Sequence, residues 1–330
     1  MANEPDPSGD AATEGSTPET PAARYRRLQA ERRAGPTQLL ETKPEYGQDT
    51  LWRGLARGGQ ARLLVVRATG AVREATSRLG CSTDVSQLAG EFIVATMLIR
   101  STLNPEERMQ VQLNHNGPLG QLIVDAWDDG GVRCYIRSPQ VELTDHPYLI
   151  GDGTLQVARS SPRRRTGHQS TVTLQADVES SMMHYLLESE QILSLLRMDV
   201  HVHEGEVVRA VGYLLQMMPE GTRDDLKQLL LNVEKLAPLG SAMRVGDPDA
   251  IAWAEQLMQG MPWDQVARED VLFSCRCSHE RILNMLATLP RADIEDLSKG
   301  DEPLEMTCDY CRTKYQMSPA EVAVLLEEPS

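Results

Sequence analysis

The sequence has few aromatic residues, no long hydrophobic run and a deficit of positive charge. Phe, Trp and Tyr make up 4% of the 330 residues, so Leu, Ile, Val and Met must fill most of any core. No stretch of about 18 apolar residues occurs, which excludes a helix that spans a bilayer. Lys and Arg number 33 against 48 Asp and Glu, a formal net charge of −15. This balance argues against broad binding of nucleic acids or anionic membranes, because both need clustered positive charge.

The start of the sequence lacks both the basic residues and the apolar stretch of a secretory signal. We therefore expect a cytoplasmic protein with no membrane partner. Disulfides are rare as a resting state in such a reducing compartment. The six cysteines need another explanation, and four of them follow residue 274.

The chain divides into four segments of different composition. Residues 1–48 contain six prolines and many Ser, Thr, Gly and Glu, so we expect a disordered tail. Residues 49–220 alternate apolar runs with turns and are expected to form a core domain. Residues 221–270 predict a metastable helical linker. Residues 271–330 predict a small zinc-binding, redox-switch domain.

The core segment predicts an α+β fold with segregated helices and strands. Residues 85–102 are apolar with helical spacing, which predicts a buried helix, and residues 178–196 predict another. Apolar runs of the β type predict strands in the remaining periodic segments, at residues 61–68, 109–114, 121–127, 131–137, 154–159, 170–176, 200–202 and 206–216. This order favours a mixed sheet domain over a parallel wound sheet.

The linker segment shows weaker patterns. One predicted helix face is apolar at i, i+3, i+4 and i+7, at Leu226, Leu229, Leu230 and Val233. Residues 250–260 predict a second short helix. Isolated helices of this length are marginal in water, so the apolar stripe needs a partner surface. We expect the core and the C-terminal module to share that role.

Four cysteines near the C-terminus form two close pairs. Cys275 and Cys277 form a Cys-X-Cys pair, and Cys308 and Cys311 form a Cys-X-X-Cys pair 30 residues further on. Such pairs suit a tetrahedral four-thiolate zinc site, because each pair grips the metal locally and the metal closes the loop. We expect one zinc ion per chain in the reduced state. Structural zinc contributes roughly 10–16 kcal/mol to the folding of a small module. A segment too short for a large core requires such a contribution.

The spacing alone leaves four interpretations open: a structural zinc module, a redox-sensing zinc switch, a zinc-ribbon module that binds nucleic acid, and unrelated thiols. The short Cys-X-Cys pair gives the switch the same weight as the structural module, because its two thiols are close enough to react together after metal loss. Charge disfavours nucleic acid, since residues 271–330 hold six Lys and Arg against eleven Asp and Glu. A zinc-ribbon interaction or transcription-associated module and a thiol oxidoreductase remain the alternatives of a different class.

Two sets of motifs resemble one family. The C-terminal motifs are FSCRCSHERILNMLATLP and EMTCDYCRTKYQMSPAEV, and the core motifs are GEFIVATMLIRSTLNPEERMQVQLNHNGPLGQLIVDA, SEQILSLLRMDVHV and GYLLQMMPEG. Together they resemble the bacterial redox-regulated chaperone family of the thirty-three-kilodalton heat-shock protein, over about residues 55–325. The resemblance is specific, because motifs at both ends match in order and spacing.

The resemblance implies an ATP-independent holdase chaperone that oxidation activates and that protects unfolded client proteins against oxidative and heat stress. The family's zinc ligands carry over to Cys275, Cys277, Cys308 and Cys311. The resemblance further implies that oxidation joins Cys275 to Cys277 and Cys308 to Cys311, and that the oxidised form is a homodimer.

Other features carry no family role. The N-terminal tail is an addition, and the basic Arg163-Arg164-Arg165 run is interpreted as a solvated loop, with client selection as the alternative. Cys134 lies in a strand pattern and Cys81 near a helix start. Cys134 is interpreted as a small core residue. Cys81 is interpreted as an inert buried thiol, with a lowered thiol pKa near the helix start as the alternative.

No pattern predicts an enzyme. His201 and His203 share one face of a strand, but no third metal ligand is near them in the sequence. Asp128-Asp129 is interpreted as a turn. The GxxxxGK[ST] loop that cradles phosphates is missing, so an ATP-driven chaperone is not supported.

Overall fold

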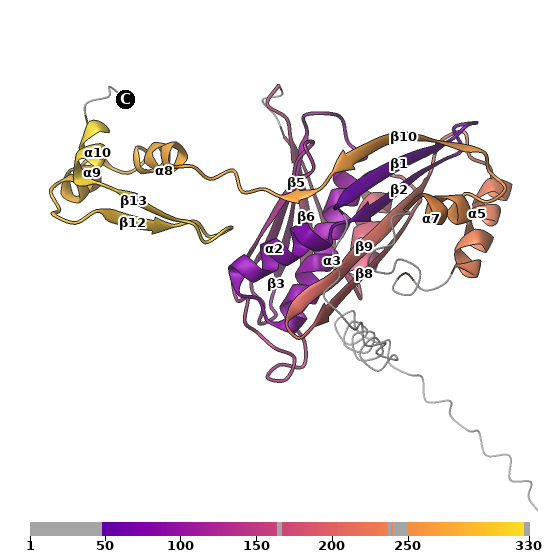
Figure 1. Ribbon diagram of the computed structural model, residues 1–330, viewed down its shortest axis with the longest axis horizontal. Coiled ribbons are helices and arrows are strands. Elements are labelled where there is room, and N and C mark those ends of the chain that lie inside the picture. Colours follow the sequence, from indigo (N-terminus) through magenta and orange to yellow (C-terminus); the bar gives the residue numbers. More distant parts are fainter. Residues whose placement is uncertain (1–47, 164–166, 237–238, 240–249, 327–330) are drawn as a thin grey trace, which may run out of the picture.

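Two β-sheets and the helices between them form the main body of the protein (Figure 1). The computed structural model describes residues 48–163, 167–236, 239 and 250–326. The first sheet is antiparallel and has the strand order β10-β1-β2-β9-β8. Its strands span, in that order, Trp263–Asp270, Thr50–Ala56, Ala61–Arg67, Glu206–Met217 and Ser194–His203.

The second sheet has the strand order β11-β5-β4-β3-β6-β7. Its strands span, in that order, Leu272–Phe273, Gly131–Ile136, Leu122–Ala126, Arg108–His115, Gly153–Ser160 and His168–Thr173. The pairing of β11 with β5 is parallel, and the other neighbours pair antiparallel. The predicted α+β class is confirmed, since strands follow one another along the chain and the helices form a separate layer.

Helix α3 (Thr83–Arg100) lies at the centre of the core and contacts strands of both sheets. It is buried on nearly all sides, because its apolar residues surround the helix instead of forming one stripe. Gly90 permits the close approach to the first sheet, since a Cβ atom there would lie 2.8 Å from a methyl carbon of Val200. Helices α2 (Thr69–Leu79) and α4 (Val178–Glu188) pack beside α3.

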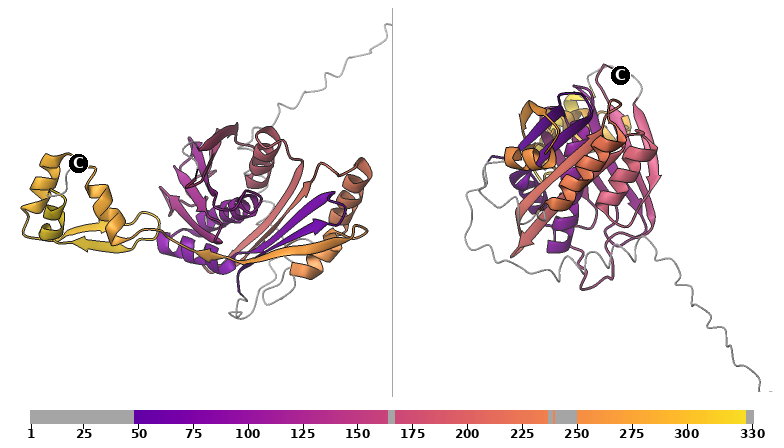
Figure 2. Two further views of the ribbon diagram at one scale, coloured as in Figure 1. Left: turned by 90° about the horizontal axis from the view of Figure 1, so that it is seen from above. Right: turned by 90° about the vertical axis from the view of Figure 1, so that its right-hand side faces the viewer.

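Helices α5 (Arg223–Lys235) and α7 (Ala250–Leu257) cover the other face of the first sheet (Figure 2). Leu63 and Val65 of β2 lie in one buried cluster with Leu229 of α5 and Trp253 of α7. We expected the linker to pack on both the core and the C-terminal module. Among the residues described, this cluster contains only core and linker residues, so that expectation is wrong for the helical part of the linker.

The helical prediction for residues 221–270 holds for α5 and α7 but is wrong for residues 263–270, which form strand β10. This segment shows no alternating pattern, and its partners are distant in sequence. Asp264 forms an ion pair with Arg57 (3.0 Å), and the Arg268 guanidinium lies 4.7 Å from the centre of the Trp52 ring. Long-range pairing with β1 therefore decides its conformation.

The helix predicted over residues 178–196 is too long. It ends at Glu188, and Gln191 adopts a positive φ of 57° that turns the chain toward β8. Leu195 and Leu196 continue the apolar pattern of the helix, but they pair with β9 as part of a strand. Strand β1 was not predicted, because its sequence TLWRGLA does not alternate clearly.

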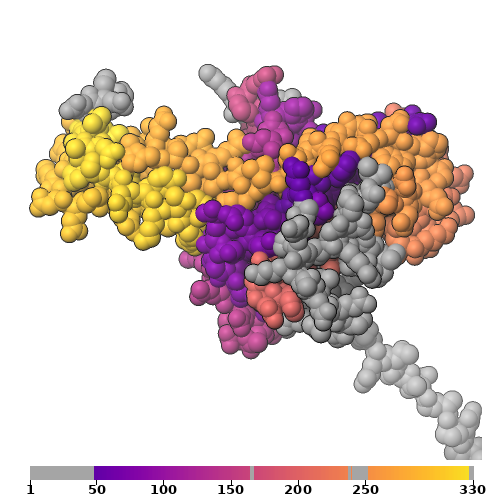
Figure 3. All heavy atoms as spheres, viewed as in Figure 1, coloured from indigo at the N-terminus to yellow at the C-terminus, as the bar shows by residue number. Residues whose placement is uncertain are grey.

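The C-terminal module is joined to the core by an extended stretch (Figure 1). It contains α8 (His279–Leu286), α9 (Arg291–Ser298), the hairpin of β12 (Leu304–Thr307) and β13 (Lys314–Met317), and α10 (Pro319–Val324). Its own core consists of five buried side chains, those of Ile282, Leu286, Ile294, Met317 and Val322. Figure 3 shows the surface of this module, in yellow and orange, meeting the purple surface of the core at one end of the molecule.

Several predictions concern residues that the structure does not describe. The predicted tail, apart from Gln48, and Arg164 and Arg165 of the basic loop lie outside the described residues. Arg163 forms an ion pair with Glu106 (2.6 Å). Within the part of the chain that is described, no helix has the length and apolar character needed to cross a membrane. The boundaries of the four predicted segments stay predictions.

Asp49 is a buried carboxyl group at the start of the core. Its Oδ2 accepts a hydrogen bond from the backbone N–H of Ala71 (2.7 Å), in the first turn of α2. Burial raises the pKa of Asp49 to about 6. An acid whose pKa is higher in the folded than in the unfolded protein favours folding when it is protonated. This contribution is fully present below about pH 4 and is lost as the pH rises through about 6.

We predict that Asp49→Asn removes this pH dependence. The free energy of unfolding of the variant, relative to the native protein, should increase between about pH 4 and about pH 7.5. The increase should reach up to about 3 kcal/mol, the energy of two pKa units. Urea unfolding at the two pH values measures it. A difference between the two proteins that stays constant with pH contradicts the prediction.

Candidate metal centre

The two cysteine pairs meet where the C-terminal module joins the core. Cys275 and Cys277 lie in the extended stretch that follows β11, the short strand paired with β5. Cys308 and Cys311 lie in the turn between β12 and β13. The N–H of Cys308 donates to the carbonyl of Thr313 (2.9 Å), which closes this turn. A hairpin and an anchored strand thus present the two pairs to each other. We call these four residues the cysteine cluster.

The four sulfur atoms of the cysteine cluster all lie within 4.8 Å of one another. Cys275 Sγ lies 3.7 Å from Cys308 Sγ, and Cys277 Sγ lies 3.4 Å from Cys311 Sγ. A tetrahedral ion with sulfur ligands at about 2.3 Å requires sulfur–sulfur distances of about 3.8 Å. The donor set and its spacing therefore fit a thiophilic metal ion.

The two short contacts join one pair to the other pair, instead of the two members of a pair. A shared ion would bring all four sulfurs together in this way, whereas two separate disulfides would not. All six cysteines are free thiols in this structure. The disulfides implied by the family resemblance, within each pair, stay a prediction.

Burial raises the pKa of thiols in the cluster, and hydrogen bonds with Tyr315 and Thr313 act against it at Cys277 and Cys311. The Tyr315 hydroxyl donates to Cys277 Sγ (3.0 Å), and Cys311 Sγ lies 3.2 Å from Thr313 Oγ1. Burial raises the pKa of Cys277 to about 12 and also raises the pKa of Cys308. At Cys311 burial is outweighed by hydrogen bonds, first those with Thr313, which lower the pKa to about 7. The hydrogen bonds with Thr313 therefore favour the thiolate form of Cys311.

The core contacts both cysteine pairs directly. Arg78 Nη1, in α2, donates to the carbonyl oxygen of Cys311 (3.3 Å). Arg133 Nη1, in β5, lies 3.7 Å from Cys275 Sγ. The sequence does not single out either arginine, because both are near the cysteines only in space. No local signal distinguishes them from other arginines of the chain.

The other residues singled out in the sequence lie apart from the cluster. Cys134 is buried in β5, and burial raises its pKa well above the ordinary value of a thiol. Burial also raises the pKa of Cys81 to about 12. His201 and His203 lie at the end of β8. Within the described residues, the cysteine cluster is the only group of three or more close His, Cys, Asp or Glu side chains that could hold a metal ion.

The Asp128-Asp129 pair lies in the turn between β4 and β5, as predicted. Asp128 accepts a hydrogen bond from the N–H of Glu106 (2.9 Å), and Asp129 accepts one from the N–H of Gly131 (3.0 Å). Asp129 also forms an ion pair with Arg276, which stands between the first two cysteines. Both carboxylates therefore have structural hydrogen-bond or ion-pair partners, and these contacts do not indicate an acid–base dyad.

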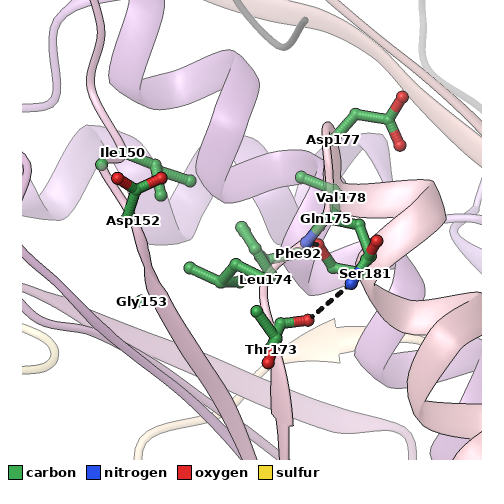
Figure 4. Close-up of a pocket in the computed structure, with 11 residues that line it drawn as sticks. Phe92, Ile150, Asp152, Gly153, Thr173, Leu174, Gln175, Asp177, Val178 and Ser181 are labelled. Atoms are coloured by element: carbon green, nitrogen blue, oxygen red, sulfur yellow. Dashed lines mark hydrogen bonds between the residues drawn. The ribbon is translucent and has the colours of Figure 1, made fainter. Parts of the chain in front are cut away.

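A separate cavity of about 70 Å³ lies between the end of β7, the start of α4 and the segment that precedes β6 (Figure 4). Phe92 and Leu174 contribute to its apolar lining, and Asp152 and Asp177 to its polar lining. It is far smaller than the roughly 300 Å³ of a typical small-molecule site. None of its lining residues is a cysteine or histidine, so it is separate from the cysteine cluster.

Comparison with known proteins confirms the resemblance seen in the sequence. The family model described as Hsp33 protein matches residues 49–318. The chain belongs to the Hsp33 family. This is a family of chaperones, and its function implies binding of unfolded proteins. The four-cysteine cluster lies at the C-terminal end of the matched region.

Relatives match along nearly their whole length. A 33 kDa chaperonin of Synechocystis is 32% identical over 298 residues, which cover 85% of this chain and 96% of the relative. A 33 kDa chaperonin of Geobacter is 29% identical over 294 residues, with 85% and 97% covered. The crystal structure of the 33 kDa chaperonin of Thermotoga maritima has a TM-score of 0.74 at 23% identity and covers 85% of this chain and 98% of that one. It shows the same fold.

We predict that oxidation spares Cys81 and Cys134. Burial keeps both groups as neutral thiols, and the thiolate is the form that oxidants attack. After peroxide treatment, mass mapping should find disulfides within the cysteine cluster and free thiols at these two positions. The same protein oxidised in urea serves as the control, because unfolding should make all six thiols reactive. Disulfides that mainly involve Cys81 or Cys134 in the native protein would place the reactive centre elsewhere.

Proposed function

We propose that the protein is a cytoplasmic, ATP-independent holdase chaperone that oxidation activates. One observation carries the proposal: a chain of the Hsp33 chaperone family gathers four cysteine sulfurs within 4.8 Å of one another. Its clients are proteins that unfold under oxidative or heat stress, which it holds until they can refold. The proposal assigns no catalytic step to the chain.

In the reduced state, the cysteine cluster holds one zinc ion as four thiolates. A four-sulfur donor set is typical of structural zinc, and the observed sulfur distances suit its tetrahedral geometry. Bound zinc keeps all four thiols ionised at neutral pH and links the two pairs. The hydrogen bond from the Tyr315 hydroxyl orients Cys277 for this role.

Oxidation converts these ligands into disulfides. Two thiolates give two electrons to one peroxide molecule, and with two protons they yield one disulfide and two water molecules. As the family resemblance implies, one disulfide joins Cys275 to Cys277 and the other joins Cys308 to Cys311. Without its metal-bound loop, the module depends on a core of five buried side chains. A core this small does not keep such a module folded.

When the C-terminal module unfolds, the linker helices that cover one face of the first sheet are released. β10 connects the linker helices to the stretch that holds Cys275, and it lies along the edge of β1. The linker helices cover an apolar face that includes Leu63, Val65 and Tyr213. Once this face is exposed, it binds the apolar segments of unfolding proteins. The active form is a homodimer, as the family resemblance implies.

The two alternatives of another class have less support. A zinc-ribbon module that binds nucleic acid conflicts with the acidic charge of residues 271–330. A thiol oxidoreductase needs a dithiol that cycles, whereas this cluster fits a shared ion. An insulin-reduction assay distinguishes them, because an oxidoreductase turns over and a holdase does not.

The test compares three samples in light scattering of a heat-denatured client without ATP. The reduced protein should contain one zinc per chain and leave aggregation unchanged. The peroxide-treated protein should lack zinc and suppress aggregation. A variant with all four cluster cysteines replaced by Ser should bind no zinc and should not respond to peroxide. A full equivalent of zinc in that variant, or equal suppression of aggregation by the reduced and the oxidised native protein, would refute the proposal.

The linker offers a matched pair of variants. Leu229 is 1% exposed in the cluster on the sheet, whereas its neighbour Leu230 is 46% exposed. Leu229→Ser should loosen α5, because burying a leucine typically contributes about 2 kcal/mol and the hydroxyl would be buried in its place. Leu230→Ser should change little.

We predict that reduced Leu229→Ser has partial chaperone activity while its zinc stays bound. Hydrogen exchange across residues 221–270 should rise in this variant and in the oxidised native protein, but not in Leu230→Ser. If the linker stays equally protected after oxidation while activity appears, clients bind elsewhere on the core.

A further inference from the structure

Arg133 connects the interior of the second sheet to the cysteine cluster. It lies on β5, directly opposite Asp125 of β4. Arg133 Nε donates to Asp125 Oδ2 (2.9 Å), and Arg133 Nη1 lies 3.7 Å from Cys275 Sγ. Only 16% of the Arg133 side chain is exposed. One guanidinium group therefore bridges a core carboxylate and a sulfur of the candidate metal centre.

Asp125 holds more than one positive group. Its side chain is 0% exposed, and its Oδ1 accepts hydrogen bonds from Arg108 Nε (3.1 Å) and Gln110 Nε2 (2.9 Å). One carboxylate thus faces two guanidinium groups, which leaves one positive charge in excess. This excess charge lies where the core meets the cysteine cluster, because Arg133 contacts both.

Aromatic rings extend the contact to both cysteine pairs. The Arg133 guanidinium carbon lies 3.7 Å from the centre of the ring of Tyr310, which stands inside the second pair. On its core side, the guanidinium lies 5.3 Å from the centre of the Trp127 ring. The guanidinium of Arg276, which stands inside the first pair, lies 4.5 Å from the same ring. The two pairs therefore contact one group of arginines and rings.

We propose that Arg133 is a positioning residue that docks the C-terminal module on the core by recognising the negative charge of the cysteine cluster. The inference rests on the proposed function, because it takes from it that oxidation changes the charge of the cysteine cluster. Four thiolates around a divalent ion carry a net charge of −2, whereas two disulfides carry none. Oxidation therefore removes the charge that attracts Arg133. The module undocks as a direct result of the thiol chemistry, before its own fold is lost.

If Arg133 had a purely structural role, replacing it would have a different effect on the protein. In that case Arg133 only compensates the buried charge of Asp125, and its loss weakens the second sheet without changing the cysteine cluster. The two roles are separated by measuring zinc affinity and docking in the folded protein.

Two backbone hydrogen bonds between the start of the module and the core report on docking. The backbone N–H groups of Leu272 and Ser274 donate to the carbonyls of Gly130 (3.1 Å) and Val132 (2.9 Å) in the core. Hydrogen exchange in residues 271–277 therefore reports whether the start of the module is attached. Exchange in the β12–β13 hairpin, residues 304–317, reports whether the module itself is folded.

The test uses full-length, reduced, zinc-loaded protein. Arg133→Met removes the charge and the planar group, and Arg133→Lys restores the charge alone. Arg137→Met is the matched control, because Arg137 is exposed just after β5. Zinc affinity is measured by competition with a chromogenic chelator, and hydrogen exchange is measured in the two segments.

Arg133→Met should lower zinc affinity about tenfold, the scale expected for a residue that supports metal ligands. Exchange in residues 271–277 should accelerate, while residues 304–317 stay protected. Arg133→Lys should recover part of both effects, and Arg137→Met should behave as the native protein. During oxidation of the native protein, exchange in residues 271–277 should rise before exchange in residues 304–317.

Equal zinc affinity and equal exchange in Arg133→Met and Arg137→Met would overturn the proposal, as would a hairpin that loses protection first during oxidation. If Arg133→Met does not fold, Tyr310→Leu replaces it, because this change removes the ring contact and leaves the sheet intact. Unchanged exchange in residues 271–277 of that variant counts against the proposal. These measurements need no client, so a failure of chaperone activity would appear separately in the scattering assay.

Discussion

The first sheet is apolar on both faces, and both faces must be covered. Successive residues of a strand point to opposite sides. In β2, Leu64 and Val66 face the cluster around α3, whereas Leu63 and Val65 face the cluster under α5 and α7. An unbroken apolar run of this kind is typical of a strand buried on both sides. The linker helices exist in their observed position because the core alone leaves one of these faces open to water.

The linker helices that cover this face are connected to the cysteine cluster through a single strand. β10 continues from the linker helices, lies at the edge of the first sheet and leads through β11 to the first cysteine pair. Several of its side chains are exposed, Val266 at 57%. Backbone hydrogen bonds and surface ion pairs hold it, and each contributes only about 1 kcal/mol. Such a strand stays in place while its far end is anchored, and in the proposed function it is this strand that links the state of the cysteine cluster to the apolar face.

Local patterns predicted the local features. The helical spacing of the apolar residues in 85–102 predicted the burial of α3, and the two close cysteine pairs predicted a common cluster, because a metal site depends on ligand type and short spacing. The stripe on α5 was predicted less well. Leu230 is exposed, and the other buried side chain of α5 besides Leu229 is that of Asn232. Asn232 donates to the carbonyls of Leu257 (3.0 Å) and Gln259 (2.8 Å). A polar residue that fastens one linker helix to the other cannot be recognised by hydrophobic periodicity.

For a related reason, the sequence could not predict the ion pairs between residues that are distant along the chain. Asp125 and Arg133 look like the polar positions of two ordinary half-buried strands, and only the register of β4 against β5 places them opposite each other. The same register directs Arg133 toward Cys275. The cysteine cluster therefore lies at the interface of core and module instead of in the interior of the module. At that place the four sulfurs could serve both as a ligand set and, as we propose, as part of a docking surface. In the proposed mechanism, a chemical change in the sulfurs therefore acts on the interface directly, whereas a cluster on the far side of the module could act only after the whole module had unfolded.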